Sequence, residues 1–345
     1  MGTSATESSR EVNLPYDQVS VVIPTFNRGE KLAEILHPVL DDPLTGEVVV
    51  VVDGSRDGSF EMLQEWSLTD PRLRPIFQEN AGDAAARQRG IEAASFDVVV
   101  VLDDDVVVSA GTIGGHARHH ADGKRLLVLG YMPTRVPKPR SPGQVATVLY
   151  ADEYEKQCEK YEEDPESILR SFWMGNISLS RVGALEVGFG TKLSIRRHSD
   201  MEFGIRCKEA GFEATFDRSL LAQHSHSRTL KRFAAEARFS GEARARLMRQ
   251  YPAFASDIDP TNEVSRASRA VVRLIGSSWM QPLSARAAMA ASSGSGRLRL
   301  WRLETIFART LRRIEIYHGF RSARDSTSPR KGTMADGHSS PLCPT

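Results

Sequence analysis

The sequence predicts an α/β fold built on a doubly wound, mostly parallel sheet flanked by helices, with a C-terminal helical extension. The first observation is residues 98–102, a run of valines ending in leucine, which is typical of a strand buried on both faces of a parallel sheet. The second is the alternation of strand-like and helix-like segments through the first hundred residues. Alternating strands and helices imply right-handed crossovers and therefore a parallel sheet.

The individual elements follow from the period of the apolar residues. Strands are predicted at residues 19–24, 47–52, 73–77 and 97–102. Helices are predicted at residues 30–40, 60–66 and 84–94, the first because its apolar residues recur at helical spacing. Further along, we expect an amphipathic helix that begins near Asp200, a short strand at residues 213–216 and a helix at residues 230–251.

Composition limits the classes of protein that fit. With 345 residues, 40% hydrophobic and 26% charged, the chain can bury one large core or two smaller ones. A net charge of +1 argues against obligatory nucleic-acid binding. Cys158, Cys207 and Cys343 show no metal-ligand spacing, as expected in a reducing compartment. No signal peptide or membrane-length apolar run is evident, so we expect a cytoplasmic protein.

Three carboxylates follow the buried strand at residues 98–102. Ligands of open α/β sheets bind at the carboxyl ends of the strands, so Asp103, Asp104 and Asp105 should lie at a binding crevice. In an extended chain Asp103 and Asp105 would point the same way and offer a paired oxygen site for a divalent cation. The alternative is a charged turn after a core strand.

Polar loops follow the first two strands, and a basic helix follows the third. Residues 24–28 (P-T-F-N-R) and 53–59 (D-G-S-R-D-G-S) could read a base or ribose by hydrogen bonds, or form an ordinary Asp-Gly turn and a helix cap. In residues 80–90 (N-A-G-D-A-A-A-R-Q-R-G), Arg87 and Arg89 could meet a diphosphate, or lie on a solvated helix face.

In order and spacing, these segments resemble the inverting family 2 glycosyltransferases, which have the GT-A fold. The resemblance implies a nucleotide-sugar site at Pro24, Thr25, Asn27, Arg28, Asp53, Ser55, Arg87, Asp103 and Asp104. It also implies that Asp105 is the main ligand of Mn²⁺ or Mg²⁺, with Asp103 as a second ligand. Two departures are Val52 before Asp53, and Gln88 where the family often has Asn after the arginine.

The second half of the chain continues the resemblance. Residues 172–181 (F-W-M-G-N-I-S-L-S-R), 186–190 (E-V-G-F-G) and 198–212 (H-S-D-M-E-F-G-I-R-C-K-E-A-G-F) are similar to the family's acceptor-side blocks. The resemblance implies acceptor-side roles for Trp173, Gly175, Asn176 and Glu202. It makes Asp200 the general base, although Ser199 replaces a usual Glu and an Asp can also simply cap a helix.

Two histidines extend the implied metal site. His224 is the first choice and His226 the second, both in the segment A-Q-H-S-H-S-R-T. An imidazole ligand favours Mn²⁺ over Mg²⁺.

The resemblance covers residues 18–232, divided into a nucleotide-binding half (18–108) and an acceptor half (109–232). Residues 233–325 should form a basic helical region, with residues 284–296 (S-A-R-A-A-M-A-A-S-S-G-S-G) as a linker. Residues 1–17 and 326–345 should be flexible tails. The basic helices could pack on the catalytic domain, form a homodimer, hold an acceptor or contact the inner face of a membrane, whereas nucleic acid is not expected.

These expectations describe a metal-dependent enzyme that moves a hexosyl or N-acetylhexosaminyl group, with inversion, from a nucleotide-diphosphate sugar to an acceptor hydroxyl. A UDP-sugar is the first choice of donor. The acceptor stays open among glycans, lipid-linked molecules, small molecules and peptides. The alternatives are a nucleotidyltransferase on a related α/β fold and a catalytically silent protein that binds sugar nucleotides.

Overall fold

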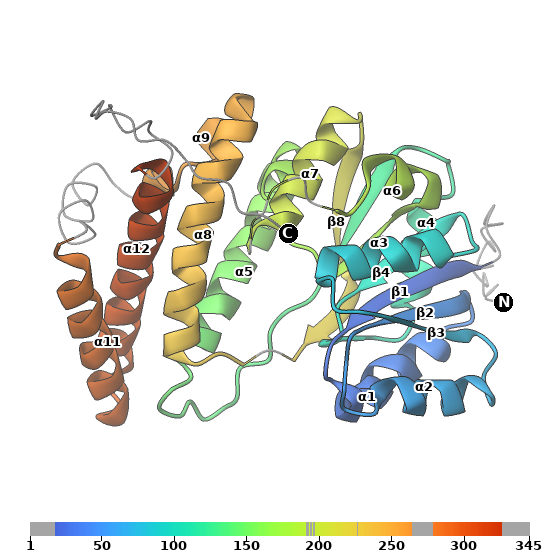
Figure 1. The fold of residues 1–345 in the computed structure, drawn as a ribbon, viewed down its shortest axis with the longest axis horizontal. Helices are drawn as coiled ribbons and strands as arrows, with labels where there is room; N and C mark the ends of the chain where they lie inside the picture. Colours follow the sequence, from blue (N-terminus) through green and yellow to red (C-terminus); the bar gives the residue numbers. More distant parts are fainter. Residues whose placement is uncertain are drawn as a thin grey trace, which may run out of the picture.

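A computed structural model of the chain describes residues 18–190, 193, 195, 197–225, 227–263 and 279–325. The strands are β1 (Val19–Thr25), β2 (Thr45–Asp53), β3 (Leu73–Gln78), β4 (Val98–Leu102), β5 (Val106–Val108), β6 (Leu126–Tyr131), β7 (Asn176–Ser180) and β8 (Glu213–His224). They form an eight-stranded sheet in the order β3-β2-β1-β4-β7-β6-β8-β5. Helices pack on both of its faces, and the predicted fold class is confirmed (Figure 1).

The helices over the sheet are α1 (Gly29–Leu40), α2 (Ser59–Ser67), α3 (Asp83–Ala93), α4 (Thr112–His119), α5 (Val145–Glu163), α6 (Arg181–Val187) and α7 (Ser199–Glu209). A second group follows β8: α8 (Leu230–Gln250), α9 (Ala255–Ile258), α11 (Gln281–Arg297) and α12 (Trp301–Asp325). Short 3₁₀ turns lie at Pro165–Arg170, Pro252–Phe254 and Pro260–Glu263.

Strands β1, β2, β3 and β4 are mutually parallel, as the alternating pattern predicted. Every residue of β1 is buried, and successive residues contact opposite faces of the sheet. Val21 and Ile23 belong to one apolar cluster, and Val22 belongs to the other. Helix α3 approaches this second layer closely, since a Cβ on Gly90 would lie 2.4 Å from Val22 Cγ1. The sheet therefore has a core on each face.

Strand β8 is longer than predicted and pairs with two different strands. Its first half runs parallel to β6, where Gly130 pairs with Asp217 and Tyr131 with Leu221, so residues 218–220 bulge out of the pairing. Its last residues run antiparallel to β5, with His224 opposite Val106. The prediction of a strand at 213–216 was too short because β5 continues the pairing beyond the apolar part of β8.

The predicted linker at residues 284–296 was wrong, because this segment forms most of α11. Its small residues pack against other helices instead of giving a flexible chain: Ala285 and Ala288 lie in a cluster with Leu311 and Ile314 of α12. The hydroxyl of Ser292 donates to the Glu304 carbonyl at 3.1 Å. Close helix packing therefore overrides the low intrinsic preference of serine and glycine.

Helices α8, α11 and α12 stand side by side at the end of the molecule away from the sheet (Figure 1). Ion pairs join α12 to α5, between Arg309 and Asp152 at 3.5 Å and between Arg312 and Glu153 at 3.1 Å. No helix within the described residues has the length and apolar character that crossing a bilayer requires. The predicted tails at 1–17 and 326–345 lie outside the described residues.

Candidate active site

The three carboxylates that follow β4 contact different partners. The chain turns here, with the Val106 amide donating to the Asp103 carbonyl at 3.2 Å, so it is not extended across Asp103–Asp105. Asp103 accepts from Arg87 Nη2 at 2.5 Å, whereas Asp104 accepts from the Thr25 hydroxyl at 2.9 Å. The prediction of an extended chain across Asp103 and Asp105 was therefore wrong.

Asp105 lies against His224, although the two residues are far apart in the sequence. Asp105 Oδ1 is 3.2 Å from His224 Nε2, and both side chains are about nine-tenths buried. The pairing of β5 with β8 brings them together, because Val106 lies opposite His224. The other imidazole nitrogen, Nδ1, lies 3.2 Å from the Thr134 hydroxyl, which fixes the orientation of the ring.

Arg28 connects the first polar loop to the same turn. Its Nη2 lies 3.2 Å from Asp105 Oδ2, and its Nε lies 3.4 Å from Asp104 Oδ1. Burial raises the pKa of Asp104 to about 6, against the opposing effects of Arg28 and the Thr25 hydroxyl. The end of β1, where Pro24 and Thr25 lie, is thus held directly against the acidic turn.

Arg87 provides a buried positive charge beside Asp103. It also pairs with Asp83 one turn earlier on α3, and its Nε has no hydrogen-bond partner among the described residues. Burial disfavours the charged guanidinium, but the two carboxylates outweigh it and raise the pKa of Arg87. The interpretation of Arg87 as a solvated helix residue was wrong, while Arg89 is exposed.

Asp200 lies near this group on a separate element. Burial raises the pKa of the Asp200 carboxyl, while the Met201 amide, Arg197 and then Arg87 act to lower it. The influence of Arg87 places Asp200 within electrostatic range of the guanidinium that holds Asp103. The predicted base and the predicted donor site are therefore brought to one region of the molecule.

Asp200 does not cap its helix. Helix α7 begins at Ser199 with His198 at the N-cap position, in the left-handed conformation at φ 63°. The Asp200 carboxylate accepts from the Met201 amide at 2.9 Å. His198 Nε2 lies 2.6 Å from the Ser240 hydroxyl, so a contact with α8 holds the start of α7 in place.

The two polar loops bind one another. The Asn27 amide donates to the Ser55 hydroxyl at 2.9 Å, and the Asn27 side-chain oxygen accepts from the Arg56 amide at 3.0 Å. Asp53 is buried, and accepts from the Gln78 side chain at 2.7 Å and from the amides of Ala81 and Gly82 at 2.8 Å. These contacts give the loops a defined shape at the carboxyl ends of β1 and β2.

Two of the four residues predicted on the acceptor side lie at this edge. Gly175 is directly beside Asp103, since a Cβ on it would approach Asp103 Oδ2 to 2.9 Å and Met132 Sδ to 2.8 Å, and its φ is 137°. Trp173 packs against the rings of Tyr150 and Tyr154, at 5.4 and 5.6 Å between ring centroids.

The other two are buried in structural contacts. Asn176 donates to the Leu220 carbonyl at 2.9 Å, and its side-chain oxygen lies 2.9 Å from His116 Nε2. Glu202 is fully buried, where it lies 3.3 Å from Arg206 Nε and accepts from the Tyr251 hydroxyl at 3.0 Å. The structure does not bring these two side chains to the surface of the site, and His226 lies outside the described residues.

Two site residues carried no recognisable motif. The Tyr150 ring of α5 lies between His224, at 5.6 Å between centroids, and the Arg228 guanidinium, at 4.4 Å from the ring centroid. Arg228 in turn pairs with Glu236 at 2.8 Å. The only sequence signal for Arg228 was its position just after the two histidines, and nothing in the local pattern distinguished Tyr150.

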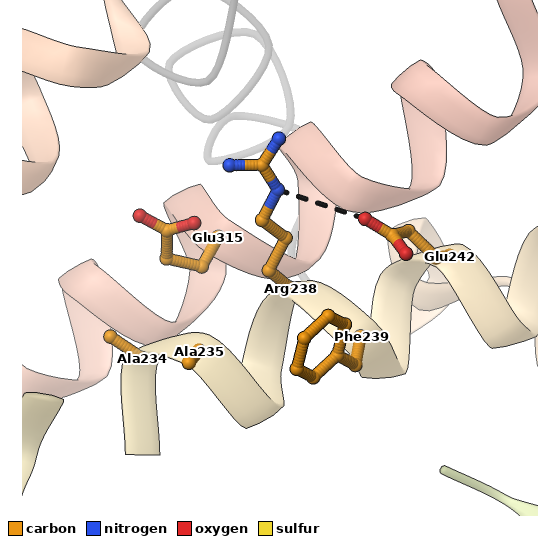
Figure 2. A pocket seen from close by; sticks show the side chains of 6 residues that line it. All are labelled: Ala234, Ala235, Arg238, Phe239, Glu242 and Glu315. Atoms are coloured by element: carbon orange, nitrogen blue, oxygen red, sulfur yellow. Dashed lines mark ion pairs between the residues drawn. The ribbon is translucent and has the colours of Figure 1, made fainter. Parts of the chain in front are cut away.

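An open pocket of about 450 Å³ lies elsewhere, on the C-terminal helices. Figure 2 shows Arg238 paired with Glu242 on α8, and Glu315 reaching in from α12. Phe239 and two alanines complete its lining. None of the predicted site residues lines this pocket, so it is separate from the Asp103–Asp105 turn.

The residues at the turn fit a metal held partly by its substrate. Among the described residues, no group of three or more His, Cys, Asp or Glu side chains forms a metal site. Asp105 and His224 supply one carboxylate and one imidazole at a suitable separation. Mg²⁺ and similar ions in nucleotide sites are often bound by one or two protein ligands together with substrate phosphates and water. Two protein ligands therefore suit a nucleotide-diphosphate site.

Comparison with known proteins finds a family that part of the chain matches. Residues 20–186 match the family described as "Glycosyl transferase family 2". Residues 20–186 are therefore similar to glycosyltransferase family 2. The predicted resemblance is confirmed for this segment, which contains the Asp103–Asp105 turn, Arg87 and Gly175.

Part of the chain is similar to parts of several bacterial glycosyltransferases. It is 35% identical over 97 residues to glycosyltransferase GlyG of Streptococcus pneumoniae, covering 28% of this chain and 32% of that protein. It is also 35% identical over 89 residues to TuaG of Bacillus subtilis, a putative teichuronic acid biosynthesis glycosyltransferase, covering 25% of this chain and 35% of that protein. The matched segment thus spans about a third of the length of these curated relatives.

Two solved structures share the fold over most of the chain. The mannosyltransferase PcManGT from Pyrobaculum calidifontis, in complex with GDP-Man and Mn²⁺, superposes with a TM-score of 0.54 at 17% identity, covering 88% of this chain and 87% of that one. Residues 1–349 of TarS from S. aureus give a TM-score of 0.51 at 14% identity, covering 91% and 93%. The GT-A fold is therefore confirmed.

Proposed function

We propose that this chain is a metal-dependent, inverting glycosyltransferase that moves a sugar from a nucleotide-diphosphate donor to an acceptor hydroxyl. The observation that carries the proposal is the contact between Asp105 and His224, beside Asp103 and Arg87, at the carboxyl edge of the sheet. Carboxylates and imidazoles bind divalent metals, and guanidinium groups pair with phosphates, so this set of groups suits a metal-bound diphosphate.

In this proposal the donor diphosphate lies over the Asp103–Asp105 turn. Asp105 and His224 would hold Mn²⁺ or Mg²⁺, which when bound neutralises the negative charge that develops on the departing diphosphate. Arg28 lies at the same turn and can exchange its contact with Asp105 for a phosphate oxygen, because its side chain is one-third exposed. Arg87 fixes the Asp103 carboxylate.

Asp200 is the proposed general base. Its carboxylate would accept the proton of the acceptor hydroxyl as that oxygen attacks the anomeric carbon from the face opposite the diphosphate, which inverts the configuration. Support comes from its electrostatic proximity to Arg87 and from its raised pKa. A raised pKa makes the Asp200 carboxylate a stronger proton acceptor.

The loops at Asn27, Asp53 and Ser55 are the proposed contacts of the nucleoside. A UDP-sugar is the donor that we propose to test first. GDP-mannose is the second, because the similar fold of PcManGT was solved with GDP-Man and Mn²⁺.

Thermal unfolding with a panel of nucleotide sugars, with and without Mn²⁺, tests the proposal. One donor class should stabilise the protein only when the metal is present, by about 1.4 kcal/mol at a tenfold excess over the dissociation constant. The same donor with Mn²⁺ should be hydrolysed slowly in the absence of an acceptor. Equal stabilisation in the presence of a chelator would contradict the metal-bridged donor site.

A further inference from the structure

The tip of the α11–α12 hairpin exposes an unusual set of side chains. Its sequence, R-L-R-L-W-R-L-E-T-I at residues 297–306, alternates arginine and leucine. Leu298 is 72% exposed, Leu300 47%, Leu303 44% and Ile306 55%. Exposed apolar side chains that are close together in this way are typical of a contact surface, whereas isolated ones are ordinary. We call residues 297–306 the hairpin tip.

The hairpin tip is positively charged on its exposed side. Arg297, Arg299 and Arg302 are exposed, and among the described residues no ion pair is recorded for any of them. The one acidic residue between positions 281 and 314 is Glu304, which is buried and pairs with Arg140 at 2.5 Å. The exposed leucines are therefore surrounded by cations without compensating carboxylates.

The hairpin tip is fixed in place, and a single loop connects it to the candidate active site. The Arg140 guanidinium lies over the Trp301 ring, at 4.9 Å from its centroid, in addition to its ion pair with Glu304. Arg140 belongs to the segment between β6 and α5, which also contains Thr134, the partner of His224. The loop is therefore held at one end by the hairpin tip and at the other by the candidate metal ligand.

We propose that the hairpin tip is the contact surface of this protein for an anionic lipid bilayer. The leucines and Ile306 would enter the boundary between headgroups and acyl chains, and the arginines would pair with lipid phosphates. Each arginine near an anionic leaflet contributes roughly a five-fold gain in affinity. The surface goes beyond sugar transfer, and its binding can be measured without any assay of activity.

The charge pattern distinguishes a bilayer from the other partners of such a helix. In a two-fold dimer the same patch would face itself, so the unpaired arginines of both copies would be brought together. A nucleic acid would satisfy the arginines but would leave the leucines in water. An anionic bilayer is the partner that satisfies both kinds of side chain.

Vesicle co-sedimentation of the full chain tests the proposal. We expect binding to phosphatidylcholine vesicles that contain 30 mol% phosphatidylglycerol, and much weaker binding to pure phosphatidylcholine vesicles or in 0.5 M NaCl, where charges are screened. The double variant Leu298→Gln, Leu303→Gln removes apolar surface without changing charge. It should lower the affinity for the anionic vesicles at least ten-fold.

Leu68→Gln is the matched control, because Leu68 is 85% exposed at the end of α2, outside the hairpin tip. This variant should bind like the unmodified chain, and circular dichroism melting should show that all variants are folded. Equal binding to neutral and anionic vesicles, or unchanged binding of the Leu298/Leu303 variant, would overturn the proposal. So would a lipid-free dimer that the double variant dissociates, because the hairpin tip would then be an interface between copies.

Discussion

Asp105 and His224 lie 3.2 Å apart because β8 continues past β6 and pairs with β5, which places His224 opposite the residue that follows Asp105. Asp105 directly precedes β5, whereas His224 is the last residue of β8. The Thr134 hydroxyl contacts the other nitrogen of the imidazole, Nδ1. The contact therefore depends on the tertiary fold.

The first prediction concerns Asp105. Asp105→Ala should abolish the metal-dependent stabilisation by the nucleotide sugar, because the main proposed metal ligand is lost, and the unliganded protein should stay folded. Thermal unfolding with donor and Mn²⁺ measures the effect. Asp122→Ala, at an exposed turn where Asp122 pairs with Lys124, is the control and should retain the full shift. A normal shift in the Asp105 variant would end its assignment as the metal ligand.

The second prediction separates structure from chemistry at Asp200. Asp200→Asn removes a buried negative charge from the first turn of α7, and because burial already disfavours that charge, the change should have little effect on stability. If Asp200 is the base, turnover should fall about 10²-fold or more while donor affinity is kept. Measuring donor affinity and turnover on one preparation tests both points. Near-normal turnover would show that another group accepts the proton.

The third prediction concerns the space beside Asp103. Gly175→Ala places a Cβ less than 3 Å from Asp103 Oδ2 and Met132 Sδ at a positive φ, so the acidic turn must shift. We expect a loss of about 1–3 kcal/mol of stability and weaker donor binding. Gly190→Ala is the control, since a Cβ there meets nothing within 4 Å. If both variants bind the donor equally well, the position of Asp103 does not matter for binding.

The fourth prediction concerns pH. His116 and His120 are buried around the Ser178 hydroxyl, at 2.9 and 2.8 Å, and burial lowers the pKa of His116 to about 3 and that of His120 to about 4. The unfolded chain takes up these protons near pH 6.5, so stability should be fully present above pH 6.5 and should fall by several kcal/mol towards pH 4.

Asp104 acts in the opposite direction, because its raised pKa of about 6 makes the folded state bind a proton more readily than the unfolded state. The combined depression at the two histidines is larger, so a net loss is expected on acidification. Urea unfolding at pH 7 and pH 5 measures it, and His120→Gln should reduce the difference between the two pH values. A pH-independent free energy of unfolding would contradict the prediction.

The alternating core of the fold was predictable because β1, β2 and β4 are nearly continuous apolar runs whose burial leaves little choice of structure. The turn at Asp104 was not, because nothing local indicates that the Asp103 carbonyl accepts from Val106 instead of continuing the strand. Helix α11 was also missed, because its small residues favour a helix only when they pack against Leu311 and Ile314 of α12, which lie later in the sequence.

The candidate site was also predictable only in part. The order of the motifs predicted one site that contains Asp105, His224, Arg87 and Gly175. In the structure these residues lie around the Asp103–Asp105 turn. Asn176 and Glu202 lie in the same motifs, yet they serve the core through His116 and Tyr251. A motif reports that a residue type matters, but only packing distinguishes a group that faces a ligand from one that supports the backbone beneath it.

Two parts of β8 should respond differently to an inserted or deleted residue. Residues 218–220 lie outside the pairing with β6, so an inserted or deleted residue there can be absorbed by the bulge. The segment from Leu221 to His224 cannot absorb such a change, because Ala222, Gln223 and His224 each pair with a residue of β5. Side chains also alternate between the two faces of a strand, so a shift by one residue moves each side chain to the opposite face. One extra residue in those four positions would turn the imidazole to the opposite face from Asp105, so the proposed metal site depends on the length of this four-residue segment.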